Sequence, residues 1–438
     1  MAPALVLAGL AGCASLPEYH PPLAQGSETH LRLVGAGDTS SPEQGQTDLL
    51  RRHAALVRAA TGAPLIPGNE VSLLVDGPAT YAAIFQAIEG ARDHINLETF
   101  VFDDDTLGRK FADALIQKQA AGVQVNIIYD PVGSWATPQA FFQRMAEAGI
   151  AILPYRPVEY IVDLAHRDHR KMLIVDGRIA FTGGANIMAV YGSSSRWAEA
   201  HLHHVPDANT GWRDTDIEIR GPAVADFQRL FLETWRRQHG SPLAPRCYFP
   251  ALHREGDKTV AVIGSGPGNG QSRVYFALLS AIANAADSIH ITMAYFVPDR
   301  QLLQELIAAA RRGVEVTLIL PGITDHASIL AAARAHYAEL LAAGVRIYEE
   351  RDFLLHAKTA VIDGVWSTVG SANMDFLSFL RNDELNAVVL GGQFGRQMEA
   401  MFQADLRVAT LVNPETWAER SVWERLMESC ATAVGAWL

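Results

Sequence analysis

The sequence predicts an α/β protein built from two similar domains, each with a mixed, mostly parallel sheet flanked by helices. Short apolar or β-branched runs alternate with segments of helical periodicity, and this order is typical of parallel strands joined by helices. The pattern H-x-K-x4-D occurs twice, at His169 and at His356, and a loop of small residues ending in Asn follows each copy. The elements before the first copy recur before the second. We therefore expect an internal duplication, with one active site at the pseudo-two-fold interface.

The first half contains a regular series of strands and helices. Apolar runs predict strands at residues 68–75, 95–102, 123–129 and 150–155, and helical periodicity predicts helices at 49–60, 79–91, 107–121 and 141–148. Gly122 and Gly149 end two of these helices. A buried strand at 172–175 follows His169, and 179–182 forms its return strand after a turn at Gly177.

The second half repeats this order. Residues 288–298, 313–320 and 344–348 correspond to strands, 301–312 and 331–343 to helices, and His356 follows them. We therefore place the first domain at residues 67–250 and the second at residues 251–410. A tether and short helix at 14–66 precede them, and a helical segment at 411–438 follows.

Each copy of the motif brings polar side chains to the end of a buried strand. The catalytic set comprises His169, Lys171 and Asp176 in the first copy and His356, Lys358 and Asp363 in the second. Because residues i and i+2 of a strand share a face, each His–Lys pair is expected to point the same way. The two aspartates stand beside glycine turns, so we expect them to be structural and to bond local backbone.

The paired motifs resemble the HKD motifs of the phospholipase D superfamily. The segments WRDT at 212–215, YFVP at 295–298, LHAKT at 355–359 and GSANMD at 370–375 are similar to the cardiolipin synthase branch. The resemblance implies a phosphatidyltransferase that forms a covalent phosphohistidine intermediate. It also implies phospholipid substrates in a membrane, with phosphatidylglycerol as donor and cardiolipin as product, and it indicates no protein partner.

An anionic phosphodiester explains this combination of residues. Lys171 and Lys358 would neutralise phosphate oxygens. Asn186 and Asn373, with small residues such as Ser371 before them, would bind the substrate and donate hydrogen bonds as charge builds on phosphorus. One imidazole can attack phosphorus, while the other protonates the leaving alkoxide and then deprotonates the incoming alcohol. Lysines and hydrogen-bond donors replace a metal in this scheme, so we expect no metal and no other cofactor.

Each catalytic histidine needs an acceptor that holds its far ring nitrogen. We expect Asp214 to orient His169 and Glu384 to orient His356, because each acid follows its motif on what is predicted to be the next strand. In the phospholipase D superfamily the histidine of the first motif is usually the nucleophile, so the resemblance implies that His169 is the nucleophile and His356 the acid/base. The residues alone leave the reverse assignment open.

Composition restricts the alternatives. The 438-residue chain has a formal net charge of −12, which argues against a general nucleic-acid binder, so no nucleic-acid partner is expected. Two rivals remain: a hydrolase of the same fold, either a phospholipase or a nuclease, and an inactive membrane-tethered scaffold. Residues 375–378 (DFLS) depart from the D-x-R-S of many relatives, which leaves the choice of head group or acceptor alcohol open.

The N-terminus resembles a lipoprotein signal. Residues 1–12 are apolar and end in LAG before Cys13, so we expect 1–13 to be a lipoprotein-like signal peptide with Cys13 as the lipidated residue. The usual positive n-region is missing, which a true start upstream of Met1 would explain. Such an anchor would hold the chain on the periplasmic side of the inner or outer membrane. Because no apolar run of about 18 residues occurs, we expect no transmembrane helix.

Three further features have less specific interpretations. The loop at 190–211 contains His201, His203 and His204, which favour a solvated loop over a metal site because no carboxylate or cysteine stands at ligand spacing. This loop is also a hypothetical lid over the site. Cys247 and Cys430 are expected to be buried free thiols rather than a disulfide. The tryptophans of the C-terminal segment favour packing against the body over lying in a bilayer interface.

Overall fold

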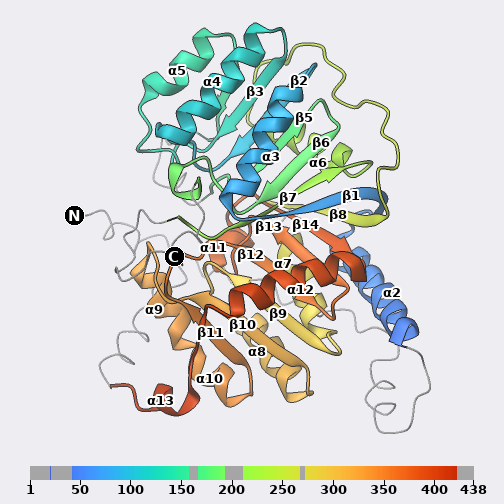
Figure 1. Ribbon diagram of the computed structural model, residues 1–438, viewed down its shortest axis with the longest axis vertical. Coiled ribbons are helices and arrows are strands. Elements are labelled where there is room, and N and C mark those ends of the chain that lie inside the picture. Colours follow the sequence, from blue (N-terminus) through green and yellow to red (C-terminus); the bar gives the residue numbers. More distant parts are fainter. Residues whose placement is uncertain (1–19, 21–41, 157–165, 193–210, 267–271, 422–438) are drawn as a thin grey trace.

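The computed structural model describes residues 20, 42–156, 166–192, 211–266 and 272–421 (Figure 1). The expected signal peptide with Cys13, most of the tether, the histidine-rich loop and Cys430 lie outside the described residues. Of the C-terminal segment, the described part is a short helix, and the Trp417 ring lies 4.9 Å from that of Tyr337 in the body, as expected. Cys247 is exposed, which corrects the expectation of a buried thiol.

The elements of the first half follow the expected order. They are α2 (Pro42–Thr61), β1 (Ile66–Val75), α3 (Gly77–Gly90), β2 (His94–Thr99), α4 (Thr106–Ala120), β3 (Gln124–Tyr129) and α5 (Gln139–Glu147). After these come β4 (Ala151–Pro154), β5 (Met172–Val175), β6 (Ile179–Gly183), the 3-10 turn η3 (Ala189–Tyr191), β7 (Thr215–Arg220) and α6 (Val224–Arg237).

The second half repeats the order and extends it. It begins with β8 (Lys258–Ser265), α7 (Arg273–Ala283), β9 (Ser288–Met293), α8 (Arg300–Arg311), β10 (Glu315–Pro321), α9 (Ala327–Ala335), α10 (Tyr337–Ala342) and β11 (Arg346–Glu350). It continues with β12 (Lys358–Ile362), β13 (Trp366–Gly370), α11 (Phe376–Leu380), β14 (Glu384–Leu390), α12 (Gly392–Leu406), β15 (Thr410–Leu411) and α13 (Pro414–Ala418). The helix expected at 331–343 is therefore two helices, broken at His336.

Within the described residues, the strands join in one 15-stranded sheet with an internal symmetry. Its order is β15-β11-β10-β9-β12-β13-β14-β8-β1-β7-β6-β5-β2-β3-β4. Reading outward from the centre, β8-β14-β13-β12-β9-β10-β11 on one side corresponds strand by strand to β1-β7-β6-β5-β2-β3-β4 on the other. The antiparallel pair of β1 and β8 lies between the halves (Figure 1). The two motif strands, β5 and β12, occupy corresponding positions on either side of this junction.

The sheet is mixed, as expected, but it is not mostly parallel. In the described residues, parallel pairing occurs within β2–β3–β4 and within β9–β10–β11, and every other pair in the sheet is antiparallel. The helical crossovers before each motif produce the parallel strands. The motif strand then runs antiparallel to β2 or β9, and a hairpin joins it to the next strand, β6 or β13.

The sequence determines the ends of equivalent helices in the same way in both halves. Asp105 and Asp299 cap α4 and α8, each accepting hydrogen bonds from two backbone N–H groups of the first turn. Gly122 and Gly313 follow these helices with φ of 91°, a left-handed conformation that glycine adopts without strain. The helices therefore begin and end so that the next strand enters the sheet in register.

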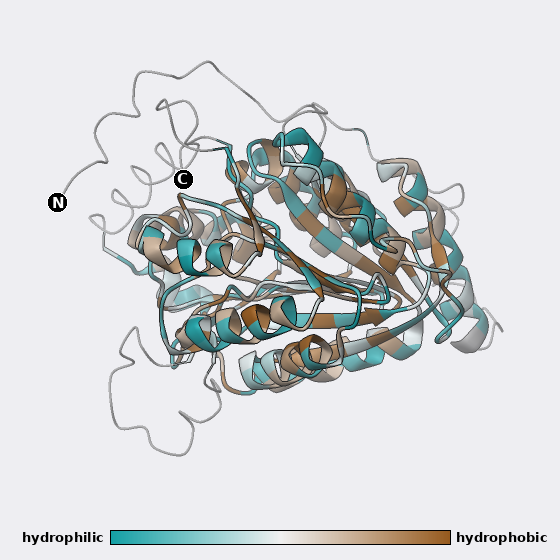
Figure 2. Ribbon diagram, turned by 90° about the horizontal axis from the view of Figure 1, so that it is seen from above, coloured by the Kyte–Doolittle hydropathy of each residue, from teal (hydrophilic) through white to brown (hydrophobic). Residues whose placement is uncertain are grey.

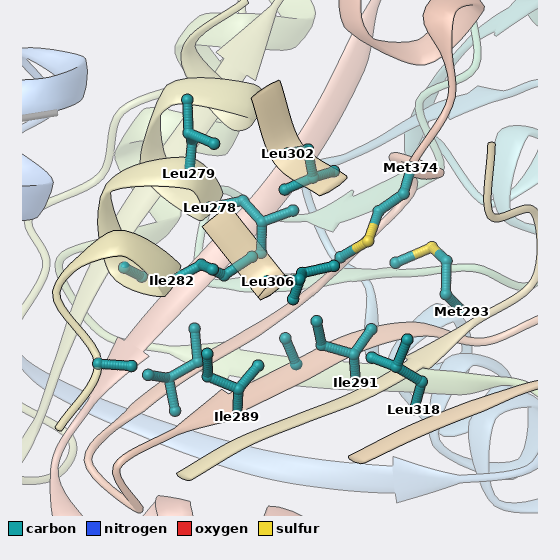
Figure 3. Packing of buried hydrophobic residues seen from close by; sticks show 14 of the residues in the cluster. Leu278, Leu279, Ile282, Ile289, Ile291, Met293, Leu302, Leu306, Leu318 and Met374 are labelled. Carbon is teal, nitrogen blue, oxygen red and sulfur yellow. The ribbon is translucent and has the colours of Figure 1, made fainter. Parts of the chain in front are cut away.

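Three large hydrophobic cores hold the layers together. Helices cover both sides of the strands, and hydrophobic segments run along the strands (Figure 2). One core belongs to the second half, where Leu278 and Ile282 of α7 pack with Ile289 and Ile291 of β9 and with Leu306 of α8 (Figure 3). A second belongs to the first half. The third contains strand residues of both halves, so burial of apolar surface stabilises the interface itself.

Helix α2 comes first in the described chain but packs on the second half. It lies beside α7 (Figure 1), where Val57 joins the core of the second half. The buried His53 Nε2 lies 2.8 Å from the carboxylate of Asp363. The segment expected as tether and short helix is thus part of the folded body from residue 42 onward. Among the described residues, none of the helices is both long and apolar enough for a bilayer span.

Candidate active site

The two motif histidines are fixed by backbone bonds to the opposite half. The N–H of His169 donates to the carbonyl of Asp383 at 2.9 Å, and the N–H of His356 donates to the carbonyl of Arg213 at 2.8 Å. Each of these acceptors comes directly before a predicted orienting acid, Glu384 in one case and Asp214 in the other. The backbone therefore places each acid beside the histidine of the other half.

The side chains complete this crossed arrangement. The Nδ1 of His169 lies 3.0 Å from a carboxylate oxygen of Glu384, and the Nδ1 of His356 lies 2.7 Å from Asp214. The sequence identified both acids, but the expected pairing within each half is wrong. Each acid follows its own motif along the chain, whereas the pseudo-two-fold arrangement turns it toward the other motif. The Nε2 atom of His169 remains for chemistry.

Burial sets the protonation of the nucleophile candidate. It lowers the pKa of His169 to about 4, which Glu384 only partly opposes, so the imidazole is neutral near pH 7. Burial alone would raise the pKa of Glu384, but His169 and Lys171 outweigh it and lower that pKa. The hydroxyl of Ser371 also donates to Glu384 at 2.5 Å. Glu384 is therefore an ionised, hydrogen-bonded partner for His169.

The second histidine has a different environment. Burial raises the pKa of Asp214 to about 7, and Gly184 stands where Ser371 stands in the other half, without a hydroxyl. Burial and the charge of Lys358 lower the pKa of His356 well below its usual range. The two His–acid pairs are therefore alike in geometry, but the pKa of Glu384 is lowered while that of Asp214 is raised. This difference distinguishes the two histidines, which the sequence alone does not.

Both lysines are buried beside their histidines. The Nζ of Lys171 donates to the carbonyl of His169 at 2.7 Å, and Lys358 makes the equivalent bond to His356. Burial lowers the pKa of Lys171 to about 7 and that of Lys358 to about 8. A phosphate group in the cavity would favour both charged forms and recover the free energy that burial costs.

The three residues expected to bind substrate fall into two groups. Asn186 and Asn373 line the cavity, and the buried Oδ1 of Asn373 has no hydrogen-bond partner among the described residues. Asn186 accepts from the N–H of Val101 through Oδ1, which leaves its amide group for the Tyr191 hydroxyl or for substrate. Ser371 is fully buried and bonds Glu384 instead, so it positions that carboxylate.

The motif aspartates are structural, but their partners are not local. Asp176 accepts hydrogen bonds from the N–H groups of residues 92–94, and Asp363 accepts from those of 286–288. These donors stand at the starts of β2 and β9. The φ angles of the two aspartates are 53° and 52°, in the left-handed region of a turn. Each carboxylate therefore ties the turn after its motif strand to the neighbouring strand.

Both histidines, Asn186 and Asn373 line one cavity of about 570 Å³. Tyr295 lines the cavity, whereas the next residue, Phe296, is buried in the core. Sequence reasoning missed Tyr191, whose hydroxyl lies 3.2 Å from the Nδ1 of His356, and Trp212, whose ring lies 5.4 Å from that imidazole. Trp212 could have been found because it stands two residues before Asp214 in the sequence. No sequence pattern marks Tyr191. Among the described residues, no group of three metal-ligating side chains occurs.

Comparisons with known proteins agree with this site. The family model described as "Cardiolipin synthase, PLD-like domain" matches residues 84–193 and 278–406. The cardiolipin synthase of Listeria monocytogenes serotype 4a (strain HCC23) is 34% identical over 375 residues, which cover 84% of this chain and 75% of that protein. The cardiolipin synthase of Geobacillus sp. (strain WCH70) is 34% identical over 407 residues, covering 92% and 79%.

Two solved structures share the fold. The phosphatidylserine synthase of Haemophilus influenzae Rd KW20 superposes with a TM-score of 0.61 at 12% identity, covering 89% of this chain and 99% of that one. The polyphosphate kinase of Porphyromonas gingivalis superposes with a TM-score of 0.52 at 15% identity, covering 79% and 49%. At such low identity the likeness supports the two-part phospholipase D-type fold alone.

Proposed function

The chain belongs to the cardiolipin synthase family with phospholipase D-like domains, and we propose that it transfers a phosphatidyl group from one phosphatidylglycerol to another. Two phosphatidylglycerols would give one cardiolipin and one glycerol. The observation that carries this proposal is the pair of histidines facing one cavity, each with its Nδ1 held by a buried acid of the opposite half.

In the first step, the Nε2 of His169 attacks phosphorus and the bond from phosphorus to the glycerol oxygen breaks. His356 acts here in its protonated form, which the bound anionic phosphodiester favours against the burial that lowers its pKa. It gives its proton to the departing alkoxide, so glycerol leaves neutral. Lys171 and Lys358 neutralise the phosphate oxygens, and Asn373 is placed to donate a hydrogen bond as charge develops. The product of this step is a phosphatidyl group bonded to the His169 imidazole.

In the second step, His356 is neutral and accepts a proton from the primary hydroxyl of the second phosphatidylglycerol. The resulting oxygen nucleophile attacks phosphorus, the phosphorus–nitrogen bond breaks, and His169 is released neutral. His356 ends protonated, as it began. Water in place of the second lipid would give phosphatidic acid, so the acceptor alone separates a transferase from a hydrolase.

The difference between the two His–acid pairs supports His169 as the nucleophile. A neutral imidazole with an ionised partner is the form that attacks phosphorus and then carries positive charge. Glu384 meets this requirement because three neighbours, His169, Lys171 and Ser371, together outweigh burial and hold its pKa low. The Asp214 carboxyl, whose pKa burial raises to about 7, suits a histidine that must gain and lose a proton in turn.

Product analysis tests this proposal. The purified full chain would be incubated in mixed micelles of detergent and phosphatidylglycerol, and the lipids would be identified by mass spectrometry. We expect cardiolipin and free glycerol from the wild type and neither from His169→Ala, while the exposed control His253→Ala keeps full activity. Phosphatidic acid as the main product would make the protein a hydrolase. A folded protein that produces neither lipid would overturn the phospholipid substrate.

We also propose that acyl chains on Cys13 hold the protein at the membrane. Residues 10–13 (LAGC) support this because they resemble a lipobox, and an anchor would keep the cavity near its lipid substrates. Expression with a radiolabelled fatty acid should label the wild type and leave Cys13→Ala unlabelled. Equal labelling of both proteins would contradict the anchor.

A further inference from the structure

The two walls of the active-site cavity come from equivalent loops but differ in polarity. Strand β3 is followed by the loop at 130–138, which brings Trp135 to the cavity, and the equivalent strand β10 is followed by the loop at 322–326, which brings Asp325. The Trp135 side chain is 83% exposed, at the rim. His326 lies next to Asp325 on the same wall. The two loops therefore differ, with an aromatic side chain at the cavity from one and a carboxylate from the other, although Asp103 and Thr137 also line the cavity on the first-half side.

Aromatic rings stand beside both catalytic histidines, including Tyr191 and Trp212 at 5.4 Å from His356, but the rings that follow the equivalent strands β2 and β9, Phe100 and Tyr295, differ in polarity. The Phe100 ring lies 5.0 Å from the imidazole of His169. The Tyr295 ring lies 6.3 Å from that of His356, and the Tyr295 hydroxyl donates to the Asp325 carboxylate at 2.9 Å. The hydroxyl also lies 3.1 Å from the second carboxylate oxygen, which is 3.5 Å from the Nε2 of His326. These contacts fix the carboxylate in the cavity, and its remaining lone pairs can accept hydrogen bonds from a ligand.

We infer that the alcohol part of the phosphodiester binds against the wall formed by Tyr295, Asp325 and His326, and that the diacylglycerol part lies toward Phe100 and Trp135. This inference rests on the proposed function and adds the position and chemistry of its head-group subsite. A carboxylate accepts hydrogen bonds from hydroxyl groups, and a polyol offers two of them next to the reacting oxygen. An aromatic wall instead suits the apolar part of a lipid.

The placement agrees with the roles of the histidines. His356 must reach the oxygen of the leaving glycerol and then that of the incoming alcohol, and it lies on the side of the acidic wall. His169 bonds phosphorus from the opposite side, as in-line displacement requires. One subsite therefore serves the leaving and the entering alcohol, and Asp325 becomes a specificity-determining residue for polyhydroxyl head groups.

Exchange of small alcohols measures this specificity directly. Labelled glycerol would be incorporated into phosphatidylglycerol by the wild type and by Asp325→Asn, and 1-propanol would serve as an acceptor with a single hydroxyl. Asparagine keeps an acceptor for the Tyr295 hydroxyl, so the loop should stay folded. We expect the glycerol concentration for half-maximal exchange to rise about tenfold or more, because a charged hydrogen bond is lost. The value for 1-propanol should change by less than about twofold.

A control and a second variant make the outcome decisive. Asp352→Asn removes an exposed acid of the second half outside the cavity lining and should leave both acceptors unaffected. Tyr295→Phe removes the hydroxyl that fixes Asp325 and should shift the glycerol value in the same direction, by less. Equal losses for glycerol and 1-propanol, or unchanged glycerol exchange, would overturn the subsite. Failure of the wild type to transfer to any alcohol would overturn the proposed function instead.

Discussion

The crossed pairing of histidines and acids makes a prediction about individual catalytic steps. Glu384→Gln should impair His169 and so slow formation of the phosphatidyl-enzyme. Asp214→Asn should impair His356, which protonates the leaving alcohol. If each acid instead served the histidine of its own half, as expected from the sequence, Asp214→Asn would impair His169 and Glu384→Gln would impair His356. The two variants therefore distinguish crossed pairing from pairing within each half.

The magnitude follows from the geometry of Glu384. Its carboxylate is fully buried and lies 3.0 Å from the Nδ1 of His169. A hydrogen bond to a charged group is worth about 1.5–3 kcal/mol, so its loss should slow the step by roughly 10- to 150-fold. The loss reaches about 10⁴-fold if the glutamine amide donates to Nδ1 and imposes the wrong tautomer, as an equivalent change does in a serine protease triad.

The assay uses a phosphatidyl ester of p-nitrophenol, which leaves as a stable anion and needs no proton. The initial burst of p-nitrophenol then reports attack by the nucleophile alone, and stopped-flow absorbance gives its rate. We expect Glu384→Gln to slow the burst by at least tenfold, because His169 makes the attack. Asp214→Asn should keep a burst within about threefold of the wild type, yet lose turnover of phosphatidylglycerol, which requires the proton from His356.

One result would refute this reasoning. If Asp214→Asn abolishes the burst and Glu384→Gln retains it, His356 is the nucleophile or the acids serve the other histidines. Circular dichroism and unfolding midpoints would accompany each variant, since both acids are buried. A variant that unfolds could be replaced by Ser371→Ala, which weakens the support of Glu384 without removing a charge and should slow the burst by less.

Three further predictions concern the membrane surface, stability and pH. Trp135→Ala should weaken binding to phosphatidylglycerol vesicles roughly tenfold in a sedimentation assay, whereas Phe249→Ala, 53% exposed and outside the cavity lining, should bind as the wild type does. His53→Ala should lower the free energy of unfolding, measured by urea titration, by about 2–3 kcal/mol. The change removes the imidazole that lies 2.8 Å from the buried carboxylate of Asp363. The pKa of His169, which burial lowers to about 4, lies below the value near 6.5 of an unfolded histidine, so the unfolded state binds more protons between these values. The free energy of unfolding should therefore fall as pH drops from about 6.5 to about 4, and His169→Gln should reduce that fall. If the variant shows the same pH dependence as the wild type, the lowered pKa of His169 is not its cause.

The sequence predicted the fold well where local chemistry determines it. The expected strand at 172–175 matches β5, and the helices ended by Gly122 and Gly313 occur within one or two residues of their expected bounds, because caps and left-handed glycines act locally. It failed where pairing is long-range. The direction of β5 and β12 depends on how the chain returns beside β2 and β9, and a period of apolar residues carries no information about that long-range pairing.

The candidate site shows the same division. Both histidines, both lysines and both acids were identifiable because duplication marks them. The partners of those residues were not, because the pairing of Glu384 with His169 depends on the rotation between the halves. The aspartates of the motifs were expected to bond nearby backbone, and they bond the starts of β2 and β9 because those strands are spatial neighbours. Tyr191 reaches His356 from a short turn that no sequence pattern distinguishes.

The crossed pairing also means that neither half contains a working site. His169 has its acid on β14, and His356 has its acid at the start of β7, so a half expressed alone would hold a buried imidazole without its partner. Such a half would also expose the apolar strand faces that form the shared core. Because each half supplies its own loop to the shared cavity, the two walls can differ without loss of either His–acid pair, and the loops carrying Trp135 and Asp325 do differ in charge.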